Sequence, residues 1–581
     1  MNRHSRTDES DDRLGWNQSP PSLSGDTTTR ADLNGIANLR TGQDTNILPH
    51  GPSHVDGWLD PGDPDTDTKA FRPTPGHLAQ GSKESSATKT SASYRTAHSR
   101  QPPTELRKLM PPFFQSLGST LVKFSKFIGP GFMVAVAYID PGNYATDVAA
   151  GAATRFKLLF IILMSNVFAI VLQSLAVRLG TVTGLNLAES CRAHLPRWLN
   201  IALYVLAEGA IIATDIAEVI GSAIALNLLL HVPLVAGCAI TLIDVLIILI
   251  FYSPDGSMRR LRAFECFVMC LVLGVVVCFC VQLSYIDNTG VGEVFKGYLP
   301  SSAVVEGEGI YLSCGILGAT VMPHSLYLGS GMVQPRLRHY DQKAGHLTTV
   351  PLSEASDSDK VIYRPSLAAI RSCLTHSTVE VCLSLFTFAL FVNSAILIVA
   401  GASLSSDDAA ESADLFDIHD LLARTLAPAA GTIFALALLL SGTSAGIVCT
   451  IAGQMLSEGA LNWTIAPWLR RLVTRSISIT PSIIIAGAVG KKGLSAALTG
   501  SQVALSVALP FVSAPLIYFT CRKQYMVVGG RRSHGDEDLQ LRQDPVYMKN
   551  HWLVSIFATL VWIVIVVMNV ALLVLVGKGK V

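Results

Sequence analysis

A carboxylate and an amide stand in the middle of an otherwise apolar stretch. They are Asp140 and Asn143 in the run Asp-Pro-Gly-Asn, with Ala, Val and Tyr before it and Ala and Val after it. Proline and glycine interrupt helical hydrogen bonding and free backbone carbonyls, and a carboxylate in apolar surroundings is costly without a partner. An oxygen-lined cation site is the simplest reading. In a water-soluble protein the same tetrapeptide would be an ordinary surface turn.

A second apolar stretch is interrupted in the same way. Residues 315–324 read Gly-Ile-Leu-Gly-Ala-Thr-Val-Met-Pro-His, so glycines and a proline free the carbonyls around Ala319. Met322 beside the proline either packs, as isolated methionines usually do, or offers a thioether. Facing Asp140, that sulfur would suit a later first-row metal better than Mg²⁺ or Ca²⁺. We expect a substrate to bind between the two interruptions.

Three further carboxylates share one face of a predicted helix. Glu208, Asp215 and Glu218 are spaced by seven and three residues, which is helical spacing. Carboxylates at membrane depth usually line a polar path. The alternative is that they form ion pairs that hold helices together.

The composition predicts which solvent surrounds these residues. The chain has 581 residues, of which 50% are hydrophobic and 15% charged, and its mean hydropathy is +0.43. From about Phe124 onward, about eleven apolar stretches approach the ~20 residues that cross a bilayer core as a helix. The sequence therefore predicts an all-α, multi-pass integral membrane protein with the lipid bilayer as its partner.

Regional composition predicts the domains and their sides of the membrane. Residues 1–112 are polar and lack apolar periodicity, which predicts a disordered tail, and residues 113–577 form the transmembrane domain, with broken helices near 140–143 and 319–323. Basic residues gather in alternate loops, including the loop 335–370, and this bias assigns the N-terminal tail and that loop to the cytosol. The apolar segment of a signal peptide is not seen at the N-terminus. We expect a plasma, endosomal or vacuolar membrane.

Several classes of function have no support. Charges are balanced at a net +1, with no basic patch for nucleic acid, and the cysteines lack metal-ligand spacing. No nucleophile, base and oxyanion grouping can be assembled from the loops, so we predict neither an enzyme nor a permanently bound cofactor.

The motifs resemble those of the Nramp family of divalent-metal transporters. The Asp-Pro-Gly-Asn run at 140–143 and the Met-Pro-His run at 322–324 are similar to its two metal-binding motifs, and residues 173–180 and 212–221 also match. The resemblance extends from about Phe124 to Val576. It implies a LeuT-like fold of two inverted five-helix repeats plus an eleventh helix, and proton-linked uptake of Mn²⁺ or Fe²⁺ into the cytosol.

The resemblance also implies roles for individual residues. Asp140, Asn143, the Ala319 carbonyl and Met322 would be the metal ligands, with Gln502 as an extra ligand in one transport state. The residues implied for a proton pathway are Asp140, Glu208, Asp215, Glu218, His324, Arg470 and Arg471, with His324 acting as relay or gate.

Three positions depart from the pattern common in the family. Many members have Asn and His where this chain has Ser325 and Gly329, and Gln where it has Ala508. The changes remove a ring that titrates near neutrality and an amide, and they leave the metal ligands intact. Two alternatives stay open: a symporter of the same fold for an organic substrate such as an amino acid, and a metal sensor that does not transport.

Overall fold

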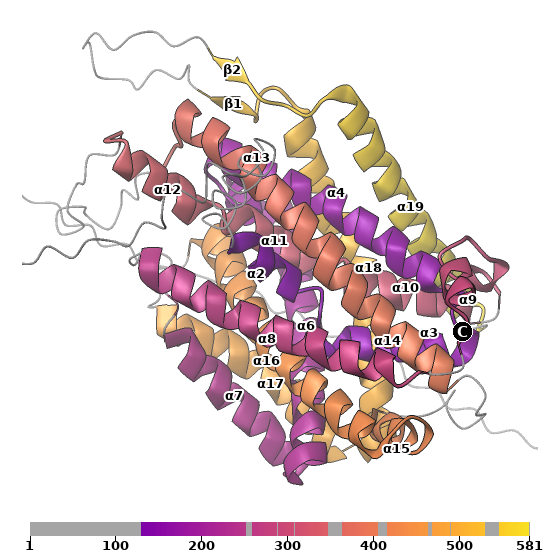
Figure 1. Ribbon diagram of the computed structural model, residues 1–581. Helices are drawn as coiled ribbons and strands as arrows, with labels where there is room; N and C mark the ends of the chain where they lie inside the picture. Colours follow the sequence, from indigo (N-terminus) through magenta and orange to yellow (C-terminus); the bar gives the residue numbers. More distant parts are fainter. Residues whose placement is uncertain are drawn as a thin grey trace, which may run out of the picture. The chain divides into compact units, whose positions relative to one another are not determined.

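The computed structural model describes residues 129–579, with gaps at 251, 253–257, 287–288, 307, 347–362, 405–414, 463–466, 489 and 529–544. The predicted disordered tail, 1–112, lies outside the described residues. Almost all of the described secondary structure is helical, and the exception is a small antiparallel pair of strands, β1 (Val527–Val528) and β2 (Val546–Tyr547). Figure 1 shows the arrangement of the helices.

The α-helices in the described ranges are α2 (Pro130–Val136), α3 (Pro141–Thr154), α4 (Leu159–Thr183), α5 (Leu187–His194), α6 (Arg197–Leu230), α7 (Leu234–Ile250), α8 (Met258–Ser284), α9 (Val291–Lys296), α10 (Gly309–Thr320), α11 (Pro323–Gly331), α12 (Gln334–Lys343), α13 (Leu367–Ser384), α14 (Leu390–Ser403), α15 (Leu415–Thr425), α16 (Pro428–Leu461), α17 (Pro467–Ala488), α18 (Gly490–Cys521) and α19 (Trp552–Gly577). A 3₁₀ turn, η1 (Ser302–Val304), precedes α10, and a π-helical turn, η2 (Leu385–Ala389), joins α13 to α14.

Seven helices in the described part of the chain are long and apolar enough to cross a membrane. They are α4, α6, α8, the continuous α13–α14 unit, α16, most of α18, and α19. Two further apolar segments are each split into two short helices, α2 with α3 and α10 with α11. The predicted number of eleven spans stays a prediction.

Both breaks have local causes in the sequence. Asp140 caps α3 by accepting hydrogen bonds from the backbone N–H groups of Gly142 and Asn143, and Pro141 occupies the first helical position. In the second segment Pro323 begins α11 directly after Met322. Proline fits the first turn of a helix because the backbone N–H groups of that turn have no acceptor within the helix, so the N–H that proline lacks is not needed.

Side chains from neighbouring helices satisfy the carbonyls that the first break frees. The Tyr138 carbonyl accepts from Asn143 at 3.1 Å and from Asn393 of α14 at 3.2 Å. Ser441 of α16 donates to the Ile139 carbonyl at 2.9 Å. Since unpaired backbone groups are costly in an apolar interior, these contacts stabilise the linker between α2 and α3.

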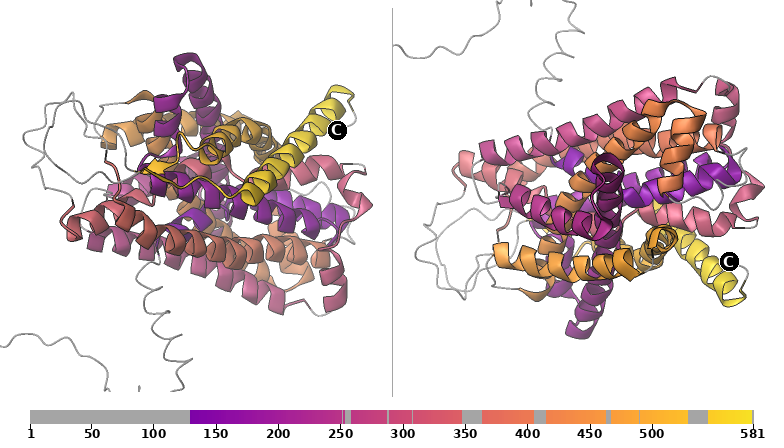
Figure 2. Two further views of the ribbon diagram at one scale, coloured as in Figure 1. Left: turned by 90° about the horizontal axis from the view of Figure 1, so that it is seen from above. Right: turned by 90° about the horizontal axis from the view of Figure 1, so that it is seen from below.

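The long helices α6, α16 and α18 surround the breaks. Helix α16 packs along α6, and α18 packs against both α6 and α10. Helix α3 contacts α14, α10, α18 and α6, so the half-helix that begins at Asp140 is enclosed on several sides. Helix α19 contacts mainly α18 and lies at the edge of the bundle (Figure 2).

One buried carboxylate holds the start of α2. Glu380 of α13 accepts from the backbone N–H groups of Gly129 at 2.6 Å and Gly131 at 3.1 Å. Arg336 of α12 pairs with Glu380 at 3.2 Å and with Glu265 of α8 at 3.6 Å. This cluster, the α2 clasp, joins α2, α8, α12 and α13 at one end of the bundle.

The segment 335–370, expected to be a loop, contains most of α12 and the start of α13; residues 347–362 lie outside the described residues. Asp341 of α12 ties this region together. It accepts from the Ser366 hydroxyl at 2.5 Å, the Ser366 N–H at 3.0 Å and the Tyr363 hydroxyl at 2.7 Å. Burial opposes ionisation of this carboxyl, but the three hydrogen bonds outweigh burial and hold the pKa of Asp341 below its ordinary value.

We predict that this tie is lost in acid. A carboxyl whose pKa is lowered by folding contributes stability above its unfolded pKa, about 4, and loses it as the pH falls through the lower folded value. The difference in unfolding temperature between the wild type and Asp341→Asn should therefore be largest near neutral pH and shrink below about pH 4. Thermal unfolding of the purified chain across pH measures it, with the exposed Glu308→Gln as control. A difference that does not vary with pH would contradict this assignment.

Candidate metal site

The two broken segments meet at Asn143. Its amide nitrogen lies 2.7 Å from Asp140 Oδ1 and 3.3 Å from the carbonyl oxygen of Ala319. Asp140, Asn143 and Ala319 are all fully buried. Residues more than 170 positions apart in the sequence are thereby brought into one polar cluster inside an apolar bundle.

Gln502 of α18 lies against both broken segments. A Cβ added to Gly142 would overlap the Gln502 amide, and a Cβ added to Gly318 would overlap the Gln502 backbone carbonyl. The Gln502 side chain is fully buried. Glycines at 142 and 318 thus allow α18 to approach α3 and α10 closely enough to add an amide to the cluster.

Two acceptor atoms in this cluster have no hydrogen-bond partner among the described residues. They are the amide oxygens of Asn143 and Gln502. Met322 is fully buried at the start of α11, three residues after Ala319. A carboxylate, two amide oxygens, a backbone carbonyl and a nearby thioether make a donor set that suits a divalent first-row metal ion.

The close approach at Gly318 gives a testable difference between two glycines of α10. At Gly315 an added Cβ would lie 3.2 Å from its nearest neighbour, the Thr146 methyl, whereas at Gly318 it would overlap backbone. We expect Gly318→Ala to destabilise the protein by about 1–3 kcal/mol through overpacking. Gly315→Ala should be close to neutral, because alanine is the better helix former. Thermal unfolding of the two variants measures the difference, and equal stabilities would contradict the proposed contact.

The structure adds a residue that the sequence analysis did not select. Asp147 of α3 is fully buried, and neither of its carboxylate oxygens has a hydrogen-bond partner in the described part of the chain. It follows Asp140 by seven residues and Asn143 by four, which places all three on one side of α3. This spacing is the feature of the sequence that could have identified Asp147.

Two of the three departures from the family pattern contact the same side chain. Gln173 of α4 donates to Ser325 at 2.9 Å and to the Tyr138 hydroxyl at 2.8 Å, and Tyr138 and Ser325 are themselves 2.9 Å apart. A Cβ added to Gly329 would overlap Gln173 Oε1. Ser325 and Gly329 therefore fit together around Gln173, which links both broken segments to α4. Ala508 is buried elsewhere, in a small apolar cluster of α6 and α18.

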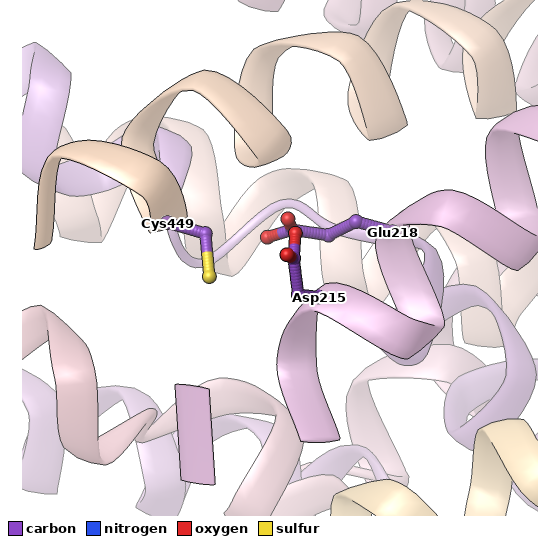
Figure 3. A group of neighbouring side chains, drawn as sticks. All are labelled: Asp215, Glu218 and Cys449. Carbon is purple, nitrogen blue, oxygen red and sulfur yellow. The ribbon is translucent and has the colours of Figure 1, made fainter. Parts of the chain in front are cut away.

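Two of the three carboxylates of α6, Asp215 and Glu218, lie close to an arginine of α17. Arg475 forms an ion pair with Asp215 and lies 3.7 Å from Glu218 Oε2, and all three side chains are buried. Cys449 of α16 lies beside the two carboxylates (Figure 3), and one ligand atom from each of the three residues lies within 4.8 Å of the others. A metal ion would have to compete there with the guanidinium of Arg475, so we interpret the cluster as an ion-pair network.

The other residues predicted for a proton pathway lie in different surroundings. His324 is buried, with its Nδ1 at 3.4 Å from the hydroxyl of Thr214, the neighbour of Asp215 on α6. Glu208 lies further toward the start of α6 and is partly buried. The side chains of Arg470 and Arg471 lie outside the described residues. Arg475, about one turn further along α17, was not selected from the sequence.

The family model for natural resistance-associated macrophage protein-like (Nramp) proteins matches residues 131–529. The chain belongs to the Nramp family. Among its relatives, the manganese transporter SMF1 of Saccharomyces cerevisiae is 50% identical over 504 residues, covering 80% of this chain and 88% of the relative. The iron transporter SMF3 of the same yeast is 54% identical over 410 residues, covering 70% and 84%.

A solved Nramp structure has the same fold. The crystal structure of the Eremococcus coleocola manganese transporter, in complex with an aromatic bis-isothiourea substituted compound, is 32% identical, with a TM-score of 0.62 over 78% of this chain and 86% of that one. The predicted family and the all-α membrane fold are therefore confirmed. This Nramp chain is a multi-pass membrane protein.

Proposed function

We propose that this Nramp chain is a secondary active transporter that moves Mn²⁺ or Fe²⁺ into the cytosol together with protons. The observation that carries the proposal is the meeting of Asp140 and Asn143 with the Ala319 carbonyl inside two broken helices. Broken helices at corresponding positions of two halves are typical of transporters that bind substrate near the bilayer midplane. Relatives named as manganese and iron transporters support the choice of metal.

Each ligand would contribute differently to metal binding. The carboxylate of Asp140 would supply negative charge, and Asn143, Ala319 and Gln502 neutral oxygen donors. The thioether of Met322 would disfavour the hard ions Mg²⁺ and Ca²⁺, which prefer all-oxygen sites. The site as proposed therefore selects transition metals by ligand type.

The proton pathway proposed here leads from the metal site to α6. His324 follows Met322 and Pro323 and reaches Thr214 of α6, whose next residue is Asp215. Asp215, Glu218 and Arg475 form a buried charged network that protons could cross by changing pairing partners. We add Arg475 to Arg470 and Arg471, the basic residues that the family resemblance implies for this pathway, because its contacts with Asp215 and Glu218 are described. Glu208 extends the row of carboxylates along α6.

The orientation is also part of the proposal. The distribution of basic loops supports a cytosolic N-terminus and a cytosolic α12 region, in a plasma, endosomal or vacuolar membrane. Transport would then run toward the side on which α2 begins.

Uptake into proteoliposomes tests the function. We expect Mn²⁺ uptake by the purified chain to rise when the outside is more acidic than the lumen, and Ca²⁺ and Mg²⁺ uptake to stay near that of empty vesicles. Asp140→Asn should abolish Mn²⁺ uptake, and Asn393→Ala, which removes a contact to the linker but no proposed ligand, should retain part of it. Normal Mn²⁺ uptake by Asp140→Asn would refute the site, and uptake independent of the pH gradient would refute proton coupling.

A further inference from the structure

A large apolar groove lies on the outer surface of the bundle, away from the metal site. It has a volume of about 700 Å³ and is lined by α18, α19 and the first turns of α6. Its walls include Leu199, Leu203, Phe511, Ala514, Trp562 and Leu573. Figure 2 shows α19 at the edge of the bundle. Five residues of α19 line the groove: Trp562, Val566, Asn569, Val570 and Leu573.

The groove opens toward the surroundings of the bundle. Phe511 is 57% exposed and Leu573 is 54% exposed, on helices that are apolar enough to cross a membrane. Lipid acyl chains would exchange rapidly on a flat lipid-facing surface. A hollow bounded by three helices instead surrounds one hydrocarbon chain on several sides and can hold it in place.

One end of the groove is basic and aromatic. Tyr518 lines that end, and the guanidinium carbon of Arg522 lies 4.5 Å from the centroid of its ring. Arg197 is the first residue of α6, two positions after Leu195 and two before Leu199, which both line the groove. Both arginines are exposed.

The start of α6 and the end of α18 thus each carry an exposed arginine. His194, just before α6, packs against Phe519 of α18 with ring centroids 5.8 Å apart, which places these two helix ends together. Apart from Tyr518 and Asn569, the residues that line the groove are apolar.

The groove also runs along the part of α18 in which two prolines interrupt the backbone hydrogen bonding. Pro510 and Pro515 both line it, and each removes a backbone donor from the interior of the helix. Trp562 of α19 donates to the carbonyl of Pro510 at 2.8 Å. Two turns before Pro510, the same helix carries Gln502 against Gly142. The groove therefore borders the same helix, about two turns from Gln502.

We propose that this groove binds an anionic phospholipid of the bilayer, with an acyl chain between α18 and α19 and the phosphate between Arg197 and Arg522. Basic pockets beside membrane helices are suited to anionic headgroups, and aromatic residues commonly lie at that depth. By supporting α18 at its prolines, the bound lipid increases metal transport. Only this last effect depends on the proposed transport function; the binding itself does not.

Native mass spectrometry of the purified full-length chain tests the binding. We expect phosphatidylserine to bind at least about tenfold more tightly than phosphatidylcholine with the same acyl chains. The net negative charge of phosphatidylserine is attracted to both arginines, and each arginine contributes about 1 kcal/mol. The double variant Arg197→Gln/Arg522→Gln should lose this preference and keep weak binding of both lipids. Arg371→Gln, which removes an exposed arginine of α13, a helix that contributes no residue to the groove, should behave as the wild type.

Substitutions that fill the groove distinguish lipid binding at this site from general contact between the protein and the bilayer. Ala514→Trp, or Leu573→Trp on the opposite wall if the first variant is unstable, should abolish tight binding of phosphatidylserine. Mn²⁺ uptake should then no longer differ between vesicles with and without phosphatidylserine, whereas Arg371→Gln should still show the difference. Unchanged phosphatidylserine binding in both tryptophan variants, or equal binding of the two lipids by the wild type, would overturn the proposal. A chain that binds the lipid but transports no metal would refute only the proposed function.

Discussion

Replacing Met322 by leucine is expected to lower the preference for Mn²⁺ over Ca²⁺ by about tenfold or more, which corresponds to about 1.4 kcal/mol of differential binding. Met322 is fully buried, so alanine at this position would also leave a cavity and cost about 2–5 kcal/mol of stability. Leucine keeps most of the volume, at a cost below about 1.5 kcal/mol, and removes only the sulfur.

The measurement is competition between Mn²⁺ and Ca²⁺ for uptake into proteoliposomes. Met322→Leu should transport Mn²⁺ less well and Ca²⁺ better than the wild type, because an apolar group cannot favour the softer ion. Leu326→Met, at another fully buried position of α11, controls for altered packing and should leave selectivity unchanged. If Met322→Leu kept the selectivity of the wild type, the thioether would have no role in choosing the metal.

Replacing Arg475 by methionine should have the second large effect. The change leaves the buried carboxylates of Asp215 and Glu218 without their cation. Removal of one partner of a buried ion pair typically costs about 3–5 kcal/mol, unless the remaining acid takes up a proton. We therefore expect a lower unfolding temperature and Mn²⁺ uptake that no longer responds to a pH gradient.

A double variant separates stability from proton transfer. Asp215→Asn added to Arg475→Met should restore part of the lost stability, because one of the two unpaired carboxylates is removed while Glu218 remains, and the two changes should be strongly non-additive. It should not restore the response to the pH gradient. Arg475→Lys, which keeps the charge but not the forked geometry, should retain part of both properties. A full response to the pH gradient in Arg475→Met would exclude this network from proton coupling.

The structure breaks both helices where the sequence places the interruptions, because the cause of each break is local. Proline and glycine act on their own turn of helix, and Asp140 and Asn143 are close neighbours in the chain. The expectation that Asn143 and Ala319 lie close together came from interruptions at corresponding positions of the two halves of the chain. Neither segment by itself would have predicted it.

Other features depend on packing that no single segment encodes. Arg475 is one of several arginines in α17, and only the crossing of α17 with α6 selects it as a partner of Asp215. Ser325 and Gly329 were recognised only as lost polar groups, whereas both lie against Gln173 of α4. The spacing of Asp147 from Asp140 and Asn143 was visible in the sequence, but only the structure shows that its carboxylate is buried without a hydrogen-bond partner among the described residues.

The α2 clasp has a consequence for how tightly the chain holds its cargo. Glu380, Arg336 and Glu265 connect four helices through shared charges, so the clasp forms or breaks largely as a unit. If metal binds well only while α2 is docked, the apparent affinity equals the intrinsic affinity multiplied by the docked fraction of molecules. Residues that do not bind the ion would then help to set its apparent affinity, which could change in evolution without any change of ligand.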